Sequence, residues 1–147
     1  MHQTFASLIL QTHGRGFTDI TGEVQRTVSA ARVQTGLCTL LLKHTSASLV
    51  IQENADPDVR RDFGAFFERL VPDGDPLFVH TVEGDDDMSA HVRTALTTVN
   101  LSLPVEGGRL CLGTWQGIYL WEHRTSPHRR TLAVHVIGES LTAGAVT

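Results

Sequence analysis

Four histidines and a run of acidic residues are the side chains of this sequence whose types and spacing suggest chemistry. His80 and His91 flank the acidic stretch EGDDDM, while His44 and His123 lie in strand-like surroundings. Neutral imidazoles and carboxylates can hold a divalent ion, or act as acid and base beside a phosphate. No HExxH or other metal motif of fixed spacing is present, so any one histidine alone is more simply explained as structural. We therefore expect chemistry where His80, His91 and a carboxylate between them meet.

Two further stretches combine polar side chains with strand-forming residues. His44 opens HTSASLVIQEN, which ends in Glu53 and Asn54. The stretch GTWQG (113–117) offers a ring that can stack and an amide that can donate and accept hydrogen bonds. It is equally compatible with a sheet bulge that packs its tryptophan. If HTSASLVIQEN is one straight strand, its nine-residue separation places His44 and Glu53 on opposite faces. They can then share a site only through a bend at TSAS or across a subunit interface.

Three stretches carry the apolar spacing of amphipathic helices. The first begins at Thr21 and is expected to stop at Gly36. The second has Asp56 as its N-cap and Pro57 as its first residue, and its apolar stripe is expected to face the core. That stripe consists of Val59, Phe63, Phe66, Phe67 and Leu70. The third follows the aspartates at 85–87, which suit the positive end of a helix dipole.

Strands are expected between and after these helices. Their ranges are 5–12, 37–53 as two strands or one bent strand, 77–82, 106–113, 114–124 and 131–140. Residues 141–147 look like a frayed tail. Strands without regular βα alternation predict an α+β fold with a mainly antiparallel sheet and two to three helices, in a single domain spanning 1–147.

Composition excludes several classes of protein. The chain has 147 residues, a net charge of -4 and 41% hydrophobic residues, which is ordinary for a globular protein that does not coat nucleic acid. No apolar run approaches the ~20 residues of a membrane span, so we expect no membrane partner and a cytoplasmic location. Cys38 and Cys111 lie in apolar, strand-like stretches and are expected to be buried thiols.

Several of these motifs together resemble one family. HTSASLVIQENADPDVRRD, the segment from His80 to His91, GGRLCLGTWQGIYLWEHR and HRRTLAVHVIGE are similar, in this order, to the YjbQ family of small trimeric proteins. Members are described as secondary thiamine-phosphate synthases. The resemblance extends from Asp19 to Glu139 and implies a homotrimeric α+β protein with polar clefts near its subunit interfaces.

On this resemblance, specific roles fall on polar positions of the chain. The residues expected to be catalytic are His44, Glu53, Asn54, His91 and Gln116. Those expected to bind the substrate are Thr45, Trp115, Arg124 and Arg130. Those expected to hold a metal are His44, His80, Asp86 and His91.

The implied reaction is a transferase reaction that joins a pyrimidine-methyl pyrophosphate to a thiazole phosphate and expels pyrophosphate. Arg124 and Arg130 would hold phosphate oxygens, and Mg²⁺ would lie near Glu53 and Asp86. Against this, the sequence has no phosphate loop and only one lysine, Lys43. A three-histidine cluster also suits Zn²⁺ better than Mg²⁺. Two alternatives therefore stay open: a metal-assisted hydrolase or other phosphate-handling enzyme, and a non-catalytic trimeric protein that binds a metabolite or metal.

Overall fold

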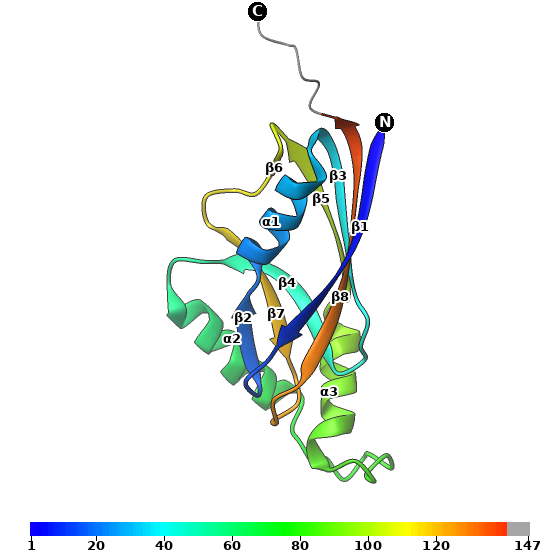
Figure 1. The fold of residues 1–147 in the computed structure, drawn as a ribbon. Coiled ribbons are helices and arrows are strands. Elements are labelled where there is room, and N and C mark those ends of the chain that lie inside the picture. The colour runs from blue at the N-terminus through cyan, green and yellow to red at the C-terminus, as the bar shows by residue number, and fades with distance from the viewer. Residues whose placement is uncertain (141–147) are drawn as a thin grey trace, which may run out of the picture.

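Two antiparallel sheets and three helices make up the part of the chain that a computed structural model describes, residues 1–140 (Figure 1). The five-stranded sheet has the order β1–β8–β3–β5–β6, and the three-stranded sheet has the order β2–β7–β4. The predicted α+β class with mainly antiparallel pairing is therefore confirmed. The predicted tail, 141–147, lies outside the described residues.

The bounds of the elements follow the chain. The strands are β1 (His2–Gln11), β2 (Gly16–Asp19), β3 (Val33–Leu42), β4 (Ala47–Glu53), β5 (Asn100–Glu106), β6 (Arg109–Leu110), β7 (Gln116–Glu122) and β8 (Arg129–Ser140). The helices are α1 (Thr21–Ala31), α2 (Pro57–Leu70) and α3 (Asp85–Leu96).

One hydrophobic core lies between the two sheets and α1. Leu40 on β3 and Val134 on β8 meet Leu49 on β4 and Leu120 on β7 within it, and all four side chains are fully buried. Val24 and Val28 on α1 close the core, as their helical spacing predicts. In Figure 1, α1 lies beside β3, β5 and β6, whereas α2 and α3 lie near the opposite end of the molecule.

Gly36 does not end α1, contrary to the prediction. The helix ends at Ala31, and Arg32 takes the left-handed conformation at its C-cap. Gly36 lies instead in β3 and pairs with Gly138 of β8. A Cβ on Gly36 would lie only 2.1 Å from the carbonyl oxygen of Ile137. The glycine is therefore needed because two backbones approach closely in the sheet.

Helix α2 begins as predicted but packs less deeply. Asp56 adopts an extended conformation and its side chain accepts a hydrogen bond from the Asp58 N–H, with Pro57 opening the helix. Phe63 and Phe67 pack edge-on against Trp121 of β7. Phe66 remains 59% exposed and Leu70, 53%. The expectation that the whole stripe faces the core is therefore wrong for its outer residues.

The strand predictions fail at 77–82 and at 100–106, and of the predicted strand at 106–113 only Arg109–Leu110 is a separate strand. The predicted strand at 77–82 is a turn segment, and Val79 on it is 96% exposed. The strand β5 was not predicted, because Pro104 and Asn100 make it look like a loop. β5 pairs with β3 along seven positions, so long-range pairing overrides weak local propensity.

The cysteines differ from each other. Cys38 is buried in β3, and burial raises its pKa to about 11. Cys111 is exposed, so the expectation of a buried thiol is wrong for Cys111. No helix within residues 1–140 is long and apolar enough to span a membrane.

Candidate functional site

His80, Asp87 and His91 converge at the N-terminal end of α3, and we call them the His–Asp–His cluster. Asp87 and His91 are four residues apart and therefore lie on one face of α3. His80 reaches the same carboxylate from the segment that precedes the helix. Asp87 Oδ2 lies 2.8 Å from His80 Nε2 and 3.1 Å from His91 Nε2. One ligand atom from each of the three residues falls within 4.8 Å of the others, which is a geometry that can hold a metal ion.

The carboxylate of Asp87 is buried but ionised. Its side chain is only 3% exposed, whereas those of His80 and His91 are 39% and 33% exposed. Burial by itself would raise the pKa of Asp87. The hydrogen bond from His80, together with the charges of His91 and Arg124, outweighs burial and lowers the pKa below its usual range.

A backbone carbonyl orients His91. Its Nδ1 lies 2.9 Å from the Thr45 carbonyl oxygen, which can only accept a hydrogen bond, so Nδ1 carries the proton. In a neutral ring Nε2 then presents a lone pair, and it faces the ionised Asp87 oxygen, which also has no proton. A proton on Nε2 or a metal ion between the two atoms resolves this contact. Metal-bound histidines commonly donate their other N–H to a carbonyl in this way.

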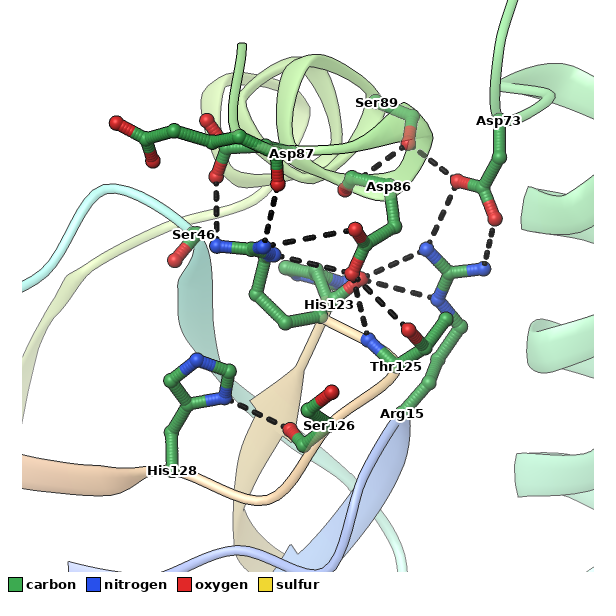
Figure 2. Close-up of polar contacts among 12 residues, drawn as sticks. Arg15, Ser46, Asp73, Asp86, Asp87, Ser89, His123, Thr125, Ser126 and His128 are labelled. Atoms are coloured by element: carbon green, nitrogen blue, oxygen red, sulfur yellow. Dashed lines mark hydrogen bonds and ion pairs between the residues drawn. The ribbon is translucent and has the colours of Figure 1, made fainter. Parts of the chain in front are cut away.

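Asp86, the predicted metal ligand, points away from the two histidines. Its carboxylate accepts hydrogen bonds from Arg124 Nε at 3.0 Å and from the Thr125 N–H at 2.9 Å, as Figure 2 shows for Thr125. Burial would raise the pKa of Asp86, but the hydrogen bonds from Arg124 and Thr125 outweigh it and lower the pKa. The structure therefore makes Asp87, not Asp86, the carboxylate that the two histidines share.

Arg124 forms ion pairs with both Asp86 and Asp87. In addition to its bonds with Asp86, its Nη1 lies 2.9 Å from Asp87 Oδ1, and its Nη2 donates to the Glu83 carbonyl at 3.1 Å. Figure 2 also shows a second arginine–aspartate pair beside this one, in which Arg15 faces Asp73 at 2.8 Å. Arg124 thus holds the start of α3 in place instead of presenting a free guanidinium to a substrate.

His44 lies in a neighbouring network and does not join the His–Asp–His cluster. Its Nε2 accepts a hydrogen bond from the Thr131 N–H at 2.7 Å, and Arg130 Nη1 lies 3.4 Å from its Nδ1. Burial, followed by the charge of Arg130, lowers the pKa of His44. The prediction of His44 as a ligand of the same ion as His80 and His91 is therefore not met in the structure.

Arg130 itself is buried in a charge pair. It is 5% exposed, and its guanidinium donates to both carboxylate oxygens of Glu122, which is fully buried. Thr12 and the Arg124 N–H also donate to Glu122. Arg130 is thus a structural counter-ion in this conformation, and its predicted contact with substrate would require the pair to open.

The other predicted site residues gather at the opposite end of β4 and β7. Glu53 accepts a hydrogen bond from the Asp56 N–H at the start of α2. Asn54 Nδ2 donates to the Thr114 carbonyl, and Gln116 accepts from the Gly113 N–H. These contacts hold the loop of GTWQG in shape. Trp115 in this loop is 64% exposed, so it is not the packed tryptophan of a bulge.

The two groups of predicted residues cannot share a site within one chain. β4 begins opposite Glu122 and ends with Glu53 opposite Gln116. Six residue steps along a strand span about 20 Å. An ion bound by both Glu53 and Asp86 is thus excluded within a protomer. The chain turns at 43–46 between β3 and β4, which belong to different sheets, so the TSAS bend separates His44 from Glu53.

His123 is the fourth histidine of the sequence, and the structure places it inside the protein. It is fully buried, and its Nε2 lies 2.8 Å from Ser48 Oγ, which is also fully buried. Among residues 1–140 its Nδ1 has no hydrogen-bond partner. Burial, followed by the charges of Arg93 and Arg15, lowers the pKa of His123 to about 3. A pair without solvent access is a structural feature and not a nucleophile with its base.

A pH dependence of stability follows from His123. The unfolded side chain has a pKa near 6.5 and the folded one near 3, so between these values only the unfolded state binds the proton. We expect the free energy of unfolding to fall as the pH drops from about 6.5, and His123→Gln to reduce this slope. Urea unfolding between pH 6.5 and 4.5 measures it. The matched change at exposed His13 should leave the slope as in the parent, and an equal effect of both changes would contradict the assignment.

The fold and the site together define an α+β protein of two antiparallel sheets with a His–Asp–His cluster beside arginine–carboxylate pairs. The chain belongs to the YjbQ family: the family model described as "UPF0047 protein YjbQ-like" matches residues 6–139. It is 51% identical to the UPF0047 protein sll1880 of Synechocystis over 132 residues, which cover 90% of each chain. It is 44% identical to the UPF0047 protein YjbQ of Escherichia coli, over 90% of this chain and 96% of that one.

Solved structures agree with the fold. A hypothetical protein of Aeropyrum pernix superimposes with a TM-score of 0.84 at 30% identity, over 92% of this chain and 99% of that one. An uncharacterized conserved protein of the YjbQ/UPF0047 family from Clostridium acetobutylicum gives a TM-score of 0.81 at 34% identity, over 90% and 99%. These names state no substrate or reaction.

Two parts of the site were missed in the sequence. Asp87 could have been found, because it lies four residues before His91 on a predicted helix, whereas Asp86 lies five before it. The pair of Glu122 and Arg130 left no local signal. The two residues belong to different strands, and only the fold brings them together.

Proposed function

We propose that this protein is a metal-dependent enzyme of the metal-assisted hydrolase class, which uses the His–Asp–His cluster to hold a divalent transition metal. The observation that carries the proposal is the 3.1 Å contact between His91 Nε2 and Asp87 Oδ2, while Nδ1 of the same ring faces the Thr45 carbonyl, so a neutral His91 would need a cation to make this contact. Asp87, His91 and His80 would together hold a divalent cation, and its charge would satisfy the facing atoms of His91 and Asp87.

The donor set favours a transition metal. Two imidazole nitrogens and one carboxylate oxygen suit Zn²⁺ and its neighbours, whereas Mg²⁺ prefers an all-oxygen shell. Ligand atoms around a tetrahedral ion with bonds of about 2.0–2.1 Å lie about 3.4 Å apart. The contacts of 2.8 and 3.1 Å in the cluster need only a small expansion to reach that separation.

Access favours catalysis over a purely structural metal. Catalytic metal sites keep a coordination position open, whereas structural sites are closed by four protein ligands. Both imidazoles are about one-third exposed, and His80 also borders a hollow of about 150 Å³ lined by Phe78 and Met88. When bound, a divalent ion would polarise a substrate oxygen or activate a water. The Thr45 carbonyl orients the His91 imidazole for this role.

Thiamine-phosphate synthesis enters the proposal only as a secondary activity. The two arginines expected to hold its phosphates, Arg124 and Arg130, are engaged by Asp86, Asp87 and Glu122. Neither guanidinium is free for a phosphate without breaking an ion pair that holds the fold together.

The test is elemental analysis of the purified protein, followed by assays with and without a chelator. We expect about one transition-metal ion per protomer, and phosphate-ester hydrolysis that stops on chelation and returns with Zn²⁺. Formation of thiamine phosphate from its two precursors is assayed in parallel. A metal-free protein whose activities ignore the chelator would show that His91 is simply protonated and that the proposal is wrong.

We also propose that the protein is a homotrimer, assembled through the outer face of the five-stranded sheet. This face carries exposed apolar side chains on β1 and β3, the two strands that flank β8: Phe5 is 68% exposed, Ile9 55% and Leu41 45%. An apolar sheet face in water favours association. A neighbouring protomer is also the remaining way to bring a Glu53 end close to a His–Asp–His cluster, in a polar cleft between subunits.

A charge placed on this face should prevent assembly. Phe5→Glu puts a carboxylate into the contact, and we expect the protein to run as a folded monomer in light scattering after size exclusion. Phe66→Glu is the matched control, since Phe66 is 59% exposed on α2, far from this sheet face, and the variant should remain trimeric. A monomeric parent, or a trimer that survives Phe5→Glu, would exclude the sheet face as the interface.

A further inference from the structure

A second concave site lies between α2, β2 and α3, and the proposed metal chemistry does not use it. It is a groove of about 380 Å³, which we call the arginine groove, lined among others by Arg15, Arg60, Arg61, Glu68, Arg93 and Trp121. Four arginines against one carboxylate give this lining a strongly positive balance. A concave surface of one charge sign concentrates ligands of the opposite sign.

Arg93 is the unusual member of the lining. It is only 2% exposed, and its guanidinium donates a hydrogen bond from Nη2 to the Val71 carbonyl at 3.0 Å. Its Nε has no partner anywhere in residues 1–140, and no carboxylate lies within ion-pair distance of it there. A buried charge without a counter-ion destabilises a fold, so its retention needs a reason.

Neighbouring groups do not neutralise Arg93. Arg15 is positive and is itself paired with Asp73 at 2.8 Å. Glu68 is the one carboxylate of the lining, and it lies beyond 4.0 Å from the guanidinium of Arg93. Burial, followed by the charge of Arg15, lowers the pKa of Arg93, and the more distant charges of Asp73 and Glu68 offset only part of this effect. The lining of the groove thus contains a desolvated cation whose Nε has no hydrogen-bond partner within residues 1–140.

The other arginines have donors left for a ligand. Arg60 uses Nη1 to bind the Glu53 carbonyl and the Tyr119 hydroxyl, at 3.1 and 3.0 Å. Arg61 is exposed on the next position of α2. A planar guanidinium can donate hydrogen bonds to two oxygens of one phosphate. A phosphate with two negative charges would also balance the excess positive charge of the groove lining.

We propose that the arginine groove binds the phosphate group of a small molecule, with Arg93 as its buried anchor and Arg60 and Arg61 at its rim. This site is independent of the metal site. Residues two apart on a helix point about 200° apart, so His91 and Arg93 face opposite sides of α3. A failure of the metal proposal therefore leaves this one standing, and the reverse also holds.

The test measures phosphate binding to the metal-free full chain, in the presence of a chelator. Titration calorimetry and thermal unfolding are run with inorganic phosphate, with glycerol phosphate and with sodium chloride at equal ionic strength. We expect one phosphate per protomer and a higher Tm with phosphate than with chloride. A tighter fit of glycerol phosphate than of inorganic phosphate identifies an ester as the ligand, and the reverse order identifies the free ion.

Variants of Arg93 and Glu68 separate binding from structure. Arg93→Met should abolish the phosphate effect and raise the Tm in phosphate-free buffer, because it removes an unpaired buried charge. Arg93→Lys, which keeps a cation, should fold and bind phosphate at least tenfold more weakly than the parent. Glu68→Gln should tighten binding, since it removes the competing carboxylate. His91→Ala and Arg109→Met, on other surfaces, should bind as the parent does.

Three results would overturn the proposal. The first is a parent protein whose Tm responds to phosphate no more than to chloride. The second is phosphate binding that survives both changes at Arg93. The third is that Arg93→Met loses stability instead of gaining it, and that Glu68→Gln loses as much. This result would show that Glu68 is the counter-ion of Arg93 in solution.

Discussion

Replacing Glu122 by glutamine is expected to lower the free energy of unfolding by about 3–5 kcal/mol, the largest effect on stability that we predict. Glu122 is fully buried, and its carboxylate accepts hydrogen bonds from Arg130 Nε at 2.9 Å, from Arg130 Nη2 and from Thr12 at 2.7 Å. An amide keeps part of this hydrogen bonding but carries no charge. The guanidinium of Arg130, only 5% exposed, would then be buried without a counter-ion.

Denaturant unfolding at one fixed protein concentration measures this loss, because assembly would otherwise change the apparent stability. Arg130→Met should be similarly destabilising, since it leaves the Glu122 carboxylate unpaired. The double variant Glu122→Leu with Arg130→Met should recover much of the loss, as a packed apolar pair can replace a buried ion pair. Glu139→Gln, at an exposed ion pair, should change little. If Glu122→Gln and Arg130→Met are each as stable as the parent, the ion pair between Glu122 and Arg130 does not form in solution.

The Glu122–Arg130 pair also predicts how the stability of the protein changes at low pH. Burial would raise the pKa of Glu122, but the hydrogen bonds from Arg130 and Thr12 outweigh it and lower the pKa below the ordinary 4.5. The stability that ionised Glu122 contributes is therefore complete above about pH 4.5 and is lost as the pH falls through the lowered pKa. The difference between the parent and Glu122→Gln should shrink in that range.

Asp87→Asn is expected to lower the affinity for a divalent transition metal by more than about 100-fold. Removal of second-shell partners alone costs about 10–100-fold, and Asp87 is the one carboxylate of the cluster. The amide keeps the shape of the side chain and its contact with Arg124 but loses the charge that holds the ion between His80 and His91. Competition with a metal-sensitive dye measures the affinity.

Asp86→Asn provides a sharp control, because Asp86 is the neighbouring residue on the same helix. Its carboxylate binds Arg124 and Thr125, so the variant should lose stability yet bind metal with the affinity of the parent. Both variants weaken one ion pair of Arg124, so a difference between them reports on the metal. Loss of metal in Asp86→Asn with retention in Asp87→Asn would restore the ligand set that the sequence suggested.

Local features were predictable from the sequence wherever neighbours along the chain decide the outcome. Asp56 and Pro57 start α2 because their own backbone preferences suit the first turn of a helix. The pairing of His80 with His91 through an acidic segment was also visible, since few residues separate them. The spacing of four residues to His91 also pointed to Asp87 and not Asp86. That His80 shares the Asp87 carboxylate could not be read from the sequence, because it depends on how the segment before the helix lies against it.

The remaining features depend on which strands pair. Gly36 looks like a helix stop in the sequence, and only its contact with Gly138 shows that it is needed for two backbones to meet. The ion pair of Glu122 with Arg130 and the unpaired charge of Arg93 likewise arise from residues that the fold brings together.

The sequence by itself determined the α+β class, the start of α2 and the polar residues that chemistry would use. The tertiary structure alone decided which of these residues meet. In the folded chain Asp87 contacts two histidines. Glu53 lies at the far end of β4, about 20 Å from the start of that strand. The reason is physical: periodicity and capping report contacts within a few residues, whereas a site depends on sheet register and helix orientation, which the whole core sets.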